Sequence, residues 1–162
     1  MAFLYFLLAA GFATVCSQSA CPAGFTLIGQ SCYAYVDHEQ DWPKAQSTCA
    51  AMGGFIAEIF DQATNDFIVQ MATKHQHRVI WLGGSDLVKS GEWVWAKSGI
   101  AVSAAFDDWA PNQLDGNKSD AQDTEDCMEM NIDKYGGHWN DDECEHKQRF
   151  IREKPASEEF IG

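Results

Sequence analysis

The chain has 162 residues, which is enough for one domain with a sizeable hydrophobic core. Six Trp and ten Phe supply the bulky apolar side chains of such a core, so the composition excludes a disordered chain. The formal net charge of -13 excludes a nucleic-acid-binding protein, because phosphate binding depends on an excess of Lys and Arg that this chain lacks.

The N-terminal segment predicts secretion. Residues 1–15 are almost entirely apolar and are followed by small polar residues from Cys16 on. This pattern predicts a secretory signal peptide over residues 1–19, since the apolar run is shorter than the about 20 residues that span a membrane. Cleavage after Ser17 or Ser19 removes Cys16 and leaves five cysteines in an oxidising compartment, where disulfides persist. We therefore expect a secreted protein without membrane insertion.

The next part of the chain predicts a hairpin and two helices. Short alternating apolar runs flank a Gly-containing turn within residues 21–36 and indicate the hairpin. Asp41 is placed to cap a helix that ends at Gly53, and Asp61 is placed to cap a second helix. The apolar faces at helical spacing are Trp42, Ala45, Cys49 and Met52 in the first helix, and Ala63, Phe67, Ile68 and Met71 in the second.

The second half of the chain predicts short strands and one long loop. Runs rich in aromatic and β-branched residues are typical of strands, and they lie at residues 79–84, 93–95, 127–132, 137–140 and 149–151. Residues 107–126 hold few apolar residues and many Asn, Asp and Gly, so we expect a long irregular loop, which in a compact domain is usually functional. Residues 155–162 are expected to form a flexible tail. Five tryptophans could stack on a sugar, but aromatic residues at strand spacing usually lie in the core, and we expect them there: Trp81, Trp93, Trp95, Trp109 and Trp139.

Acidic residues gather in and after the long loop. Between Asp107 and Glu145 the chain has thirteen Asp and Glu residues against two Lys residues. A solvated acidic surface is the ordinary outcome of such a charge run. The alternative is a site for a hard cation, because closely packed carboxylates repel one another unless a positive charge lies among them.

Several short motifs follow one another in a fixed order between residues 21 and 154. They are WLGG at 81–84, GEWVW at 91–95, WAP at 109–111, EDC at 125–127 and WNDDEC at 139–144. This ordered set resembles the C-type lectin family. The resemblance implies an α+β domain of the C-type lectin-like double-loop fold, in which two helices flank antiparallel strands and a long irregular loop carries a calcium and sugar site.

The resemblance also implies the ligands of one calcium ion. The family has a pair of carboxylate or amide side chains around a cis-proline, and Gln113 and Asp115 match that pair. Glu125 matches the acid before a Cys, and Asn140 and Asp141 match the Asn-Asp of the last motif. Ca²⁺ binds about 6–8 oxygens, so these five side chains and the Asp141 carbonyl leave room for two sugar hydroxyls. The same five residues are therefore the expected sugar-binding residues.

The order of amide and carboxylate in the loop implies the type of sugar. Gln113 before Asp115 follows the galactose-type Gln-Pro-Asp loop of the family, so galactose or N-acetylgalactosamine is the expected ligand. Leu114 stands where the family has its cis-proline, and a cis bond before a non-proline residue costs about 2.5–4 kcal/mol. Either calcium holds a strained cis bond, or a trans bond misdirects both flanking side chains. The second alternative favours a calcium-independent module that binds a protein or another surface.

The cysteines follow the family pattern with one exception. The disulfides that the resemblance implies are Cys21–Cys32 and Cys127–Cys144. Arg152 stands where the family has the partner of Cys49, so Cys49 is left over. Cys49 is either a buried inert thiol, which we favour, or it bridges to Cys16 or to another chain.

Together these features predict a secreted, calcium-dependent lectin for galactose-type or microbial surface glycans, with a role in pattern recognition or agglutination in innate immunity. Single sugars bind weakly in this family, so avidity through a homo-oligomer is expected. Catalysis is the third alternative. Glycoside hydrolases use a pair of acidic residues as acid and base, and Asp141 and Asp142 form such a pair in this sequence. No nucleophile motif accompanies these acids, and we therefore do not expect an enzyme.

Overall fold

The structure is a computed structural model that describes residues 17–75, 78–113 and 124–160, and in these residues a few helices lie among many short strands. The helices are α1 (Trp42–Ala51), α2 (Gln62–Thr73), the single turn α3 (Ile132–Tyr135) and the 3₁₀ turn η1 (Val102–Ala104). The strands are β1 (Ser17–Ala20), β2 (Thr26–Ile28), β3 (Ser31–Gln40), β4 (Phe55–Ile56), β5 (Val79–Ser85), β6 (Val94–Trp95), β7 (Cys127–Asn131), β8 (Trp139–Asp142), β9 (Gln148–Pro155) and β10 (Ser157–Phe160).

Both main helices begin at the Asp residues that the sequence predicts as caps. The Asp41 carboxylate accepts a hydrogen bond from Lys44 N at 2.9 Å, and Asp61 accepts one from Thr64 N at 2.7 Å. Each bond satisfies one of the backbone N–H groups that a helix start leaves unpaired. After α1, Gly53 has a φ of 72°, a left-handed conformation that glycine adopts without strain, and the helix ends there.

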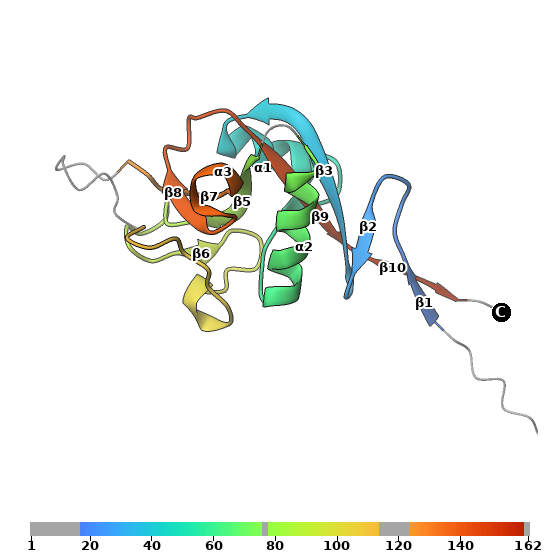
Figure 1. Cartoon of the computed structure of the whole chain (residues 1–162). Helices are drawn as coiled ribbons and strands as arrows, with labels where there is room; N and C mark the ends of the chain where they lie inside the picture. Colours follow the sequence, from blue (N-terminus) through green and yellow to red (C-terminus); the bar gives the residue numbers. More distant parts are fainter. Residues whose placement is uncertain (1–16, 76–77, 114–123, 161–162) are drawn as a thin grey trace, which may run out of the picture.

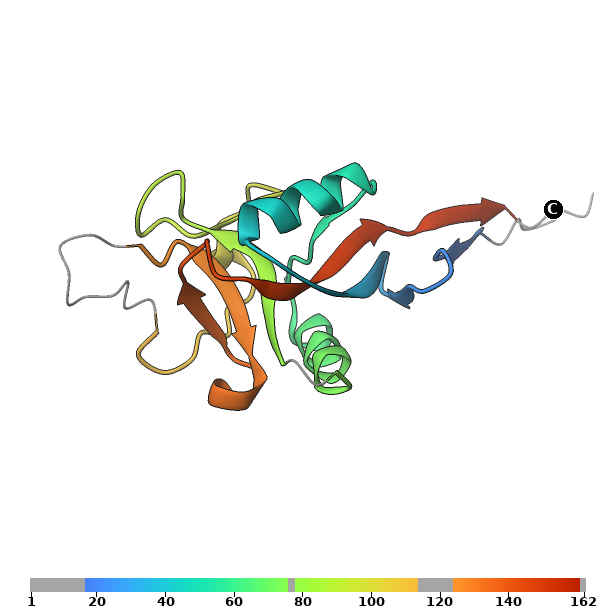
Figure 2. The same ribbon diagram turned by 90° about the horizontal axis from the view of Figure 1, so that it is seen from above.

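The strands form one main sheet with its helices on both faces. In the described residues its path is β2-β3-β9-β5-β7-β8, with β4 on β9 and β6 on β5. The neighbours are antiparallel except β5 and β9, which run parallel with Trp81 opposite Phe150. Helices α1 and α2 lie on opposite faces of the long β3–β9 pair (Figures 1 and 2). The α+β class and the two flanking helices predicted from the sequence are therefore confirmed.

The core is built mainly from aromatic and aliphatic side chains of the central strands. Trp81, Trp95 and Trp139 are fully buried. Trp93 and Trp109 are partly buried and pack edge to face with their ring centroids 4.9 Å apart. All five tryptophans thus belong to the core or pack against it, as expected for aromatic side chains at strand spacing.

The buried face of α2 differs from the face that apolar spacing predicts. Its buried residues are Thr64, Asn65, Ile68 and Ala72, while Phe67 and Met71 are only partly buried and Ala63 is exposed. Asn65 tolerates burial because its Nδ2 donates to Asp108 Oδ2 at 2.8 Å and its Oδ1 accepts from Trp139 Nε1 at 3.0 Å. Asn65, a polar residue, is therefore buried in the core, whereas hydrophobic periodicity predicted that nearby apolar residues such as Ala63 and Phe67 would be buried instead.

Both disulfides expected from the family resemblance are present, Cys21–Cys32 and Cys127–Cys144. Cys49 is a free, fully buried thiol, and burial raises its pKa to about 12. Such a thiol stays protonated at neutral pH, which agrees with the inert alternative. Nearby, the Arg152 guanidinium lies 4.5 Å from the centroid of the Phe25 ring. Its Nε and Nη1 are buried without a hydrogen-bond partner among the described residues.

The two ends of the described chain pair with each other. Strand β1 runs antiparallel to β10, with Ser17 opposite Phe160, and this ribbon projects from the body in Figures 1 and 2. The sequence suggested a signal peptide up to residue 19 and a tail from residue 155, and both places carry strand residues here. The limits of the mature domain stay a prediction. Among the residues that the structure describes, no helix is long and apolar enough to cross a membrane.

Candidate functional site

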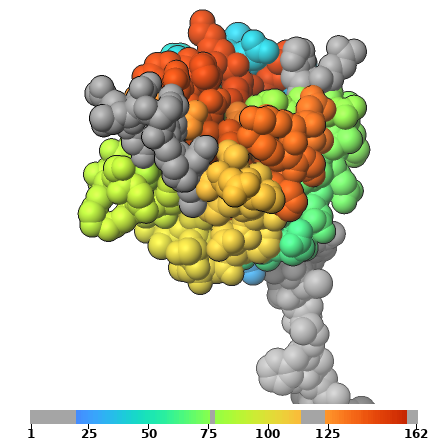
Figure 3. All heavy atoms as spheres, turned by 60° about the vertical axis from the view of Figure 1, so that its left-hand side comes forward, coloured from blue at the N-terminus to red at the C-terminus, as the bar shows by residue number. Residues whose placement is uncertain are grey.

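A polar cavity of about 710 Å³ lies along β7 and β8. Its walls come from these strands, from α3, from the segment between β8 and β9, and from the last described residue of the long loop before residue 114. Figure 3 views the molecule from the side on which the loop up to residue 113, in gold, lies beside the segment after residue 124, in orange. Four of the five predicted ligands line this one cavity: Gln113, Glu125, Asn140 and Asp141.

The ladder between β7 and β8 positions the Asn-Asp pair. Glu129 lies opposite Asn140, and Met128 lies opposite Asp141. Asn140 Nδ2 donates to Glu129 Oε1 at 3.1 Å and to the Asp141 carbonyl at 2.7 Å. The nitrogen end of this amide is therefore engaged by the protein, and the oxygen end is the one that suits a cation.

Glu129 is a residue of the cavity that sequence reasoning missed. It is only 4% exposed, and its carboxylate also accepts from Gln148 Nε2 at 2.5 Å and from Asn131 Nδ2 at 3.2 Å. Burial, and then the nearby Asp142 carboxylate, raise the pKa of Glu129 to about 7. Since Glu129 lies between two methionines on a buried strand, the only local signal was an acid at a core-like position.

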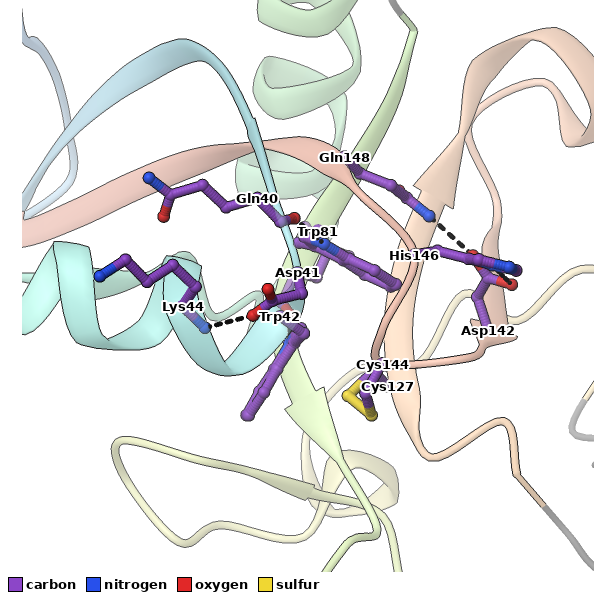
Figure 4. Close-up of a disulfide and its surroundings, with 11 residues drawn as sticks. Gln40, Asp41, Trp42, Lys44, Trp81, Cys127, Asp142, Cys144, His146 and Gln148 are labelled. Carbon is purple, nitrogen blue, oxygen red and sulfur yellow. Dashed lines mark hydrogen bonds and ion pairs between the residues drawn. A yellow bond between two sulfur atoms is a disulfide. The ribbon is translucent and has the colours of Figure 1, made fainter.

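Gln148 connects Glu129 to the outer part of the cavity. Gln148 Nε2 also lies 2.8 Å from Asp142 Oδ2, and Asp142 Oδ1 lies 2.9 Å from His146 Nδ1 (Figure 4). The hydrogen bond with Asp142 raises the pKa of His146. A continuous set of polar contacts thus runs from the buried strand β7 to the cavity rim.

Asp108 anchors the start of the long loop. Its Oδ2 accepts the bond from Asn65 on α2, and its Oδ1 lies 2.8 Å from His138 Nδ1. Its backbone carbonyl accepts from Trp139 N at 2.9 Å. One acid therefore joins the loop to α2 and to the first residue of β8.

Backbone bonds continue from this anchor to the cavity. Ala110 N donates to the Trp139 carbonyl at 2.8 Å, and Gln113 N donates to the Ala110 carbonyl at 3.0 Å. These bonds hold Gln113 at the cavity wall. Leu114 and Asp115, the other loop residues of the predicted site, lie outside the described residues.

The four described candidate ligands fit a hard cation by their chemistry. Glu125 and Asp141 offer carboxylate oxygens, and Gln113 and Asn140 offer amide oxygens. Ca²⁺ prefers such oxygen donors, whereas zinc sites use nitrogen and sulfur ligands. Over residues 17–75, 78–113 and 124–160, no three His, Cys, Asp or Glu side chains gather closely enough to hold a metal ion. Within these described residues, the two amides supply the oxygen donors beside the two carboxylates.

Comparisons with known proteins identify the family. Residues 38–154 match the Lectin C-type domain family, a stretch that contains all the cavity residues named above. The chain belongs to this family. It is 30% identical over 137 residues to the "Galactose-specific lectin nattectin" of Thalassophryne nattereri, an alignment that covers 83% of this chain and 80% of that protein. C-type lectin domains are binding modules, so the chain is not an enzyme.

Solved structures share the fold. The mouse scavenger receptor C-type lectin carbohydrate-recognition domain superposes with a TM-score of 0.74 over 85% of this chain and 100% of that chain, at 24% identity. A calcium-independent type II antifreeze protein superposes with a TM-score of 0.72 over 86% of this chain and 98% of that chain, at 27% identity. These likenesses confirm the C-type lectin-like fold. The second of these proteins is calcium-independent, so the fold also occurs in a protein that does not depend on calcium.

Proposed function

We propose that this protein is a secreted, calcium-dependent lectin of the galactose type. The observation that carries the proposal is that Gln113, Glu125, Asn140 and Asp141 line the same polar cavity. These side chains come from three separate parts of the sequence, and each one matches a calcium ligand of the family to which the chain belongs.

The carboxylates and the amides of the cavity would have different roles in binding a sugar. Ca²⁺, when bound, would supply a positive charge at the site. Two neighbouring sugar hydroxyls would then replace water molecules as ligands of the ion. The carboxylates of Glu125 and Asp141 accept hydrogen bonds from the sugar hydroxyls, and charge-assisted hydrogen bonds of this kind are strong. Both N–H groups of Asn140 already serve Glu129 and the protein backbone, so Gln113 is the amide that donates to the sugar.

The preference for galactose or N-acetylgalactosamine is supported by the Gln113-before-Asp115 order and by the galactose-specific relative.

Secretion is supported by the apolar N-terminal run and by the two disulfides, which persist outside the cytosol. We further propose that clustered glycans on microbial surfaces are the target, that a homo-oligomer supplies the avidity, and that the role lies in innate immunity.

A galactose-agarose column tests the proposal. The wild type should be retained in calcium and released by EDTA, while Asp141→Asn should lose retention because one ligand charge is removed. Asp133→Asn is the matched control, since Asp133 is an exposed acid that pairs with Arg78 outside the cavity lining. Equal retention of the wild type with and without EDTA would refute calcium dependence.

A second candidate is a lectin-like module that binds a protein or another surface without calcium. Leu114 at the position of the family's cis-proline favours it, and so does the calcium-independent antifreeze neighbour. Isothermal titration of the purified protein with Ca²⁺ separates the two candidates. Heat of binding at one site per chain supports the lectin, and its absence supports the calcium-independent module.

A further inference from the structure

Glu129 is a buried carboxylate that is not among the proposed ligands of calcium or of the sugar. We infer that Glu129 is a positioning residue, which holds the Asn140 amide so that its oxygen faces the calcium site. This inference rests on the proposed function of the cavity, and it adds a residue that no family motif marks.

The orientation of an Asn side chain is decided by its neighbours. The terminal torsion of Asn is broad and roughly two-fold, so the amide nitrogen and oxygen compete for the same place. Only the oxygen binds a cation. Here Nδ2 of Asn140 faces two acceptors, Glu129 Oε1 and the Asp141 carbonyl. A flipped amide would bring its oxygen against both acceptors and lose both bonds, which is costly for a mostly buried group.

Glu129 is itself held in place from both sides. Gln148 on β9 and Asn131 at the end of β7 both donate to it. Asn131 has a second task, because its Oδ1 accepts from Lys134 N and caps α3. The carboxylate therefore cannot turn away from Asn140 without breaking its contacts with Gln148 on β9 and with Asn131, and the amide orientation is fixed before any ligand arrives.

The charge of Glu129 is a cost to the calcium-free fold. In the described part of the chain its hydrogen-bond donors are all amides, and no Lys, Arg or His there forms an ion pair with it. A buried carboxylate without a cation is unfavourable. Residues that destabilise the fold and orient a ligand are typical of functional sites. An ion among the neighbouring ligands would offset this charge.

Glu129→Met tests the inference, because Met keeps the length of the side chain and matches its two neighbours on β7 but removes both acceptor oxygens. We expect the calcium affinity, measured by isothermal titration, to fall about 10–100-fold. The melting temperature in EDTA should stay equal or rise. Glu129→Gln keeps one acceptor for Asn140 and should lose less affinity. Gln148→Met keeps the Glu129–Asn140 bond and should also lose less.

Three results would overturn the inference. Wild-type calcium affinity in Glu129→Met would mean that Asn140 needs no such partner. A melting temperature that falls in EDTA, with calcium affinity unchanged, would mean that Glu129 only ties β7 to β9. Absence of calcium binding in the wild type would refute the proposed function itself, and it is distinguished from the other two results because it precedes any substitution.

Discussion

The two walls of the cavity are held in different ways. The wall formed by β7 and β8 has a complete backbone ladder, and the Cys127–Cys144 disulfide closes it at one end. The loop wall, residues 108–113, is attached through Asp108 and a few backbone bonds. A ladder sets the position of each ligand by strand register, whereas an attached loop depends on single contacts. We therefore expect the strand wall to keep its geometry under conditions in which the loop wall opens.

The largest effect should come from removing the disulfide of the strand wall. Replacing Cys127 and Cys144 by Ala should cost about 2–5 kcal/mol of unfolding free energy and should weaken calcium binding. Replacing Cys21 and Cys32 by Ala is the matched control, since that disulfide lies in the distant hairpin. Urea denaturation and calcium titration measure both quantities. Equal loss of calcium affinity in the two double variants would contradict the special role of the strand wall.

A new disulfide outside both walls should sharpen the comparison. Arg152→Cys restores the partner that the family has for Cys49, and it removes two buried nitrogens that lack described partners. We expect a gain of about 2–4 kcal/mol under oxidising conditions. Calcium affinity should not change, because neither wall is touched. Arg152→Ser serves as the control, and an identical stability of the Cys variant with and without reductant would show that no bridge forms.

The pH dependence of the calcium-free protein reports on the strand wall. The pKa of Glu129 is raised from 4.5 to about 7 in the fold, so the folded state holds its proton more tightly than the unfolded chain. This contribution to stability is complete below about pH 4.5 and is lost as the pH rises through 7. Relative to Glu129→Gln, the wild type should lose on the order of 2–3 kcal/mol between these limits. Urea denaturation in EDTA at several pH values measures the difference, and parallel pH profiles would contradict it.

The smallest effect should come from the loop wall. Asp108→Ala removes the bonds to Asn65 and His138 and should cost about 1–2 kcal/mol. Calcium affinity should fall as well, because Gln113 is no longer held at the cavity. Asp107→Ala is the neighbouring control, since Asp107 is exposed. If both variants bind calcium equally well, the loop wall does not depend on its anchor.

Local signals in the sequence predicted the parts of the molecule that local chemistry decides. Asp41 and Asp61 cap the two helices as expected, and motifs in a fixed order identified the family and the strands. The four described candidate ligands line one cavity, whereas Asp115 lies outside the described residues, and the role of all five as ligands stays a prediction.

Contacts between distant residues could not be predicted in this way. Asn65 is buried because of Asp108, 43 positions away, and Glu129 is held by Gln148, 19 positions away. Neither pair produces a periodic pattern, because hydrophobic periodicity records which face is apolar and not which polar groups meet. The α3 turn was missed for a similar reason, since its cap is the Asn131 side chain within what the sequence indicated as a continuous strand.

The parallel pairing of β5 and β9 also bears on how the protein is made. Strand β9 lies between β3 and β5 in the sheet, although it follows both of them along the chain. While the chain is being synthesised, the edges of β3 and β5 that later pair with β9 therefore stay unpaired until residues 148–155 have emerged. Folds dominated by such distant pairings form slowly, so the domain is completed only after nearly all of it has left the ribosome.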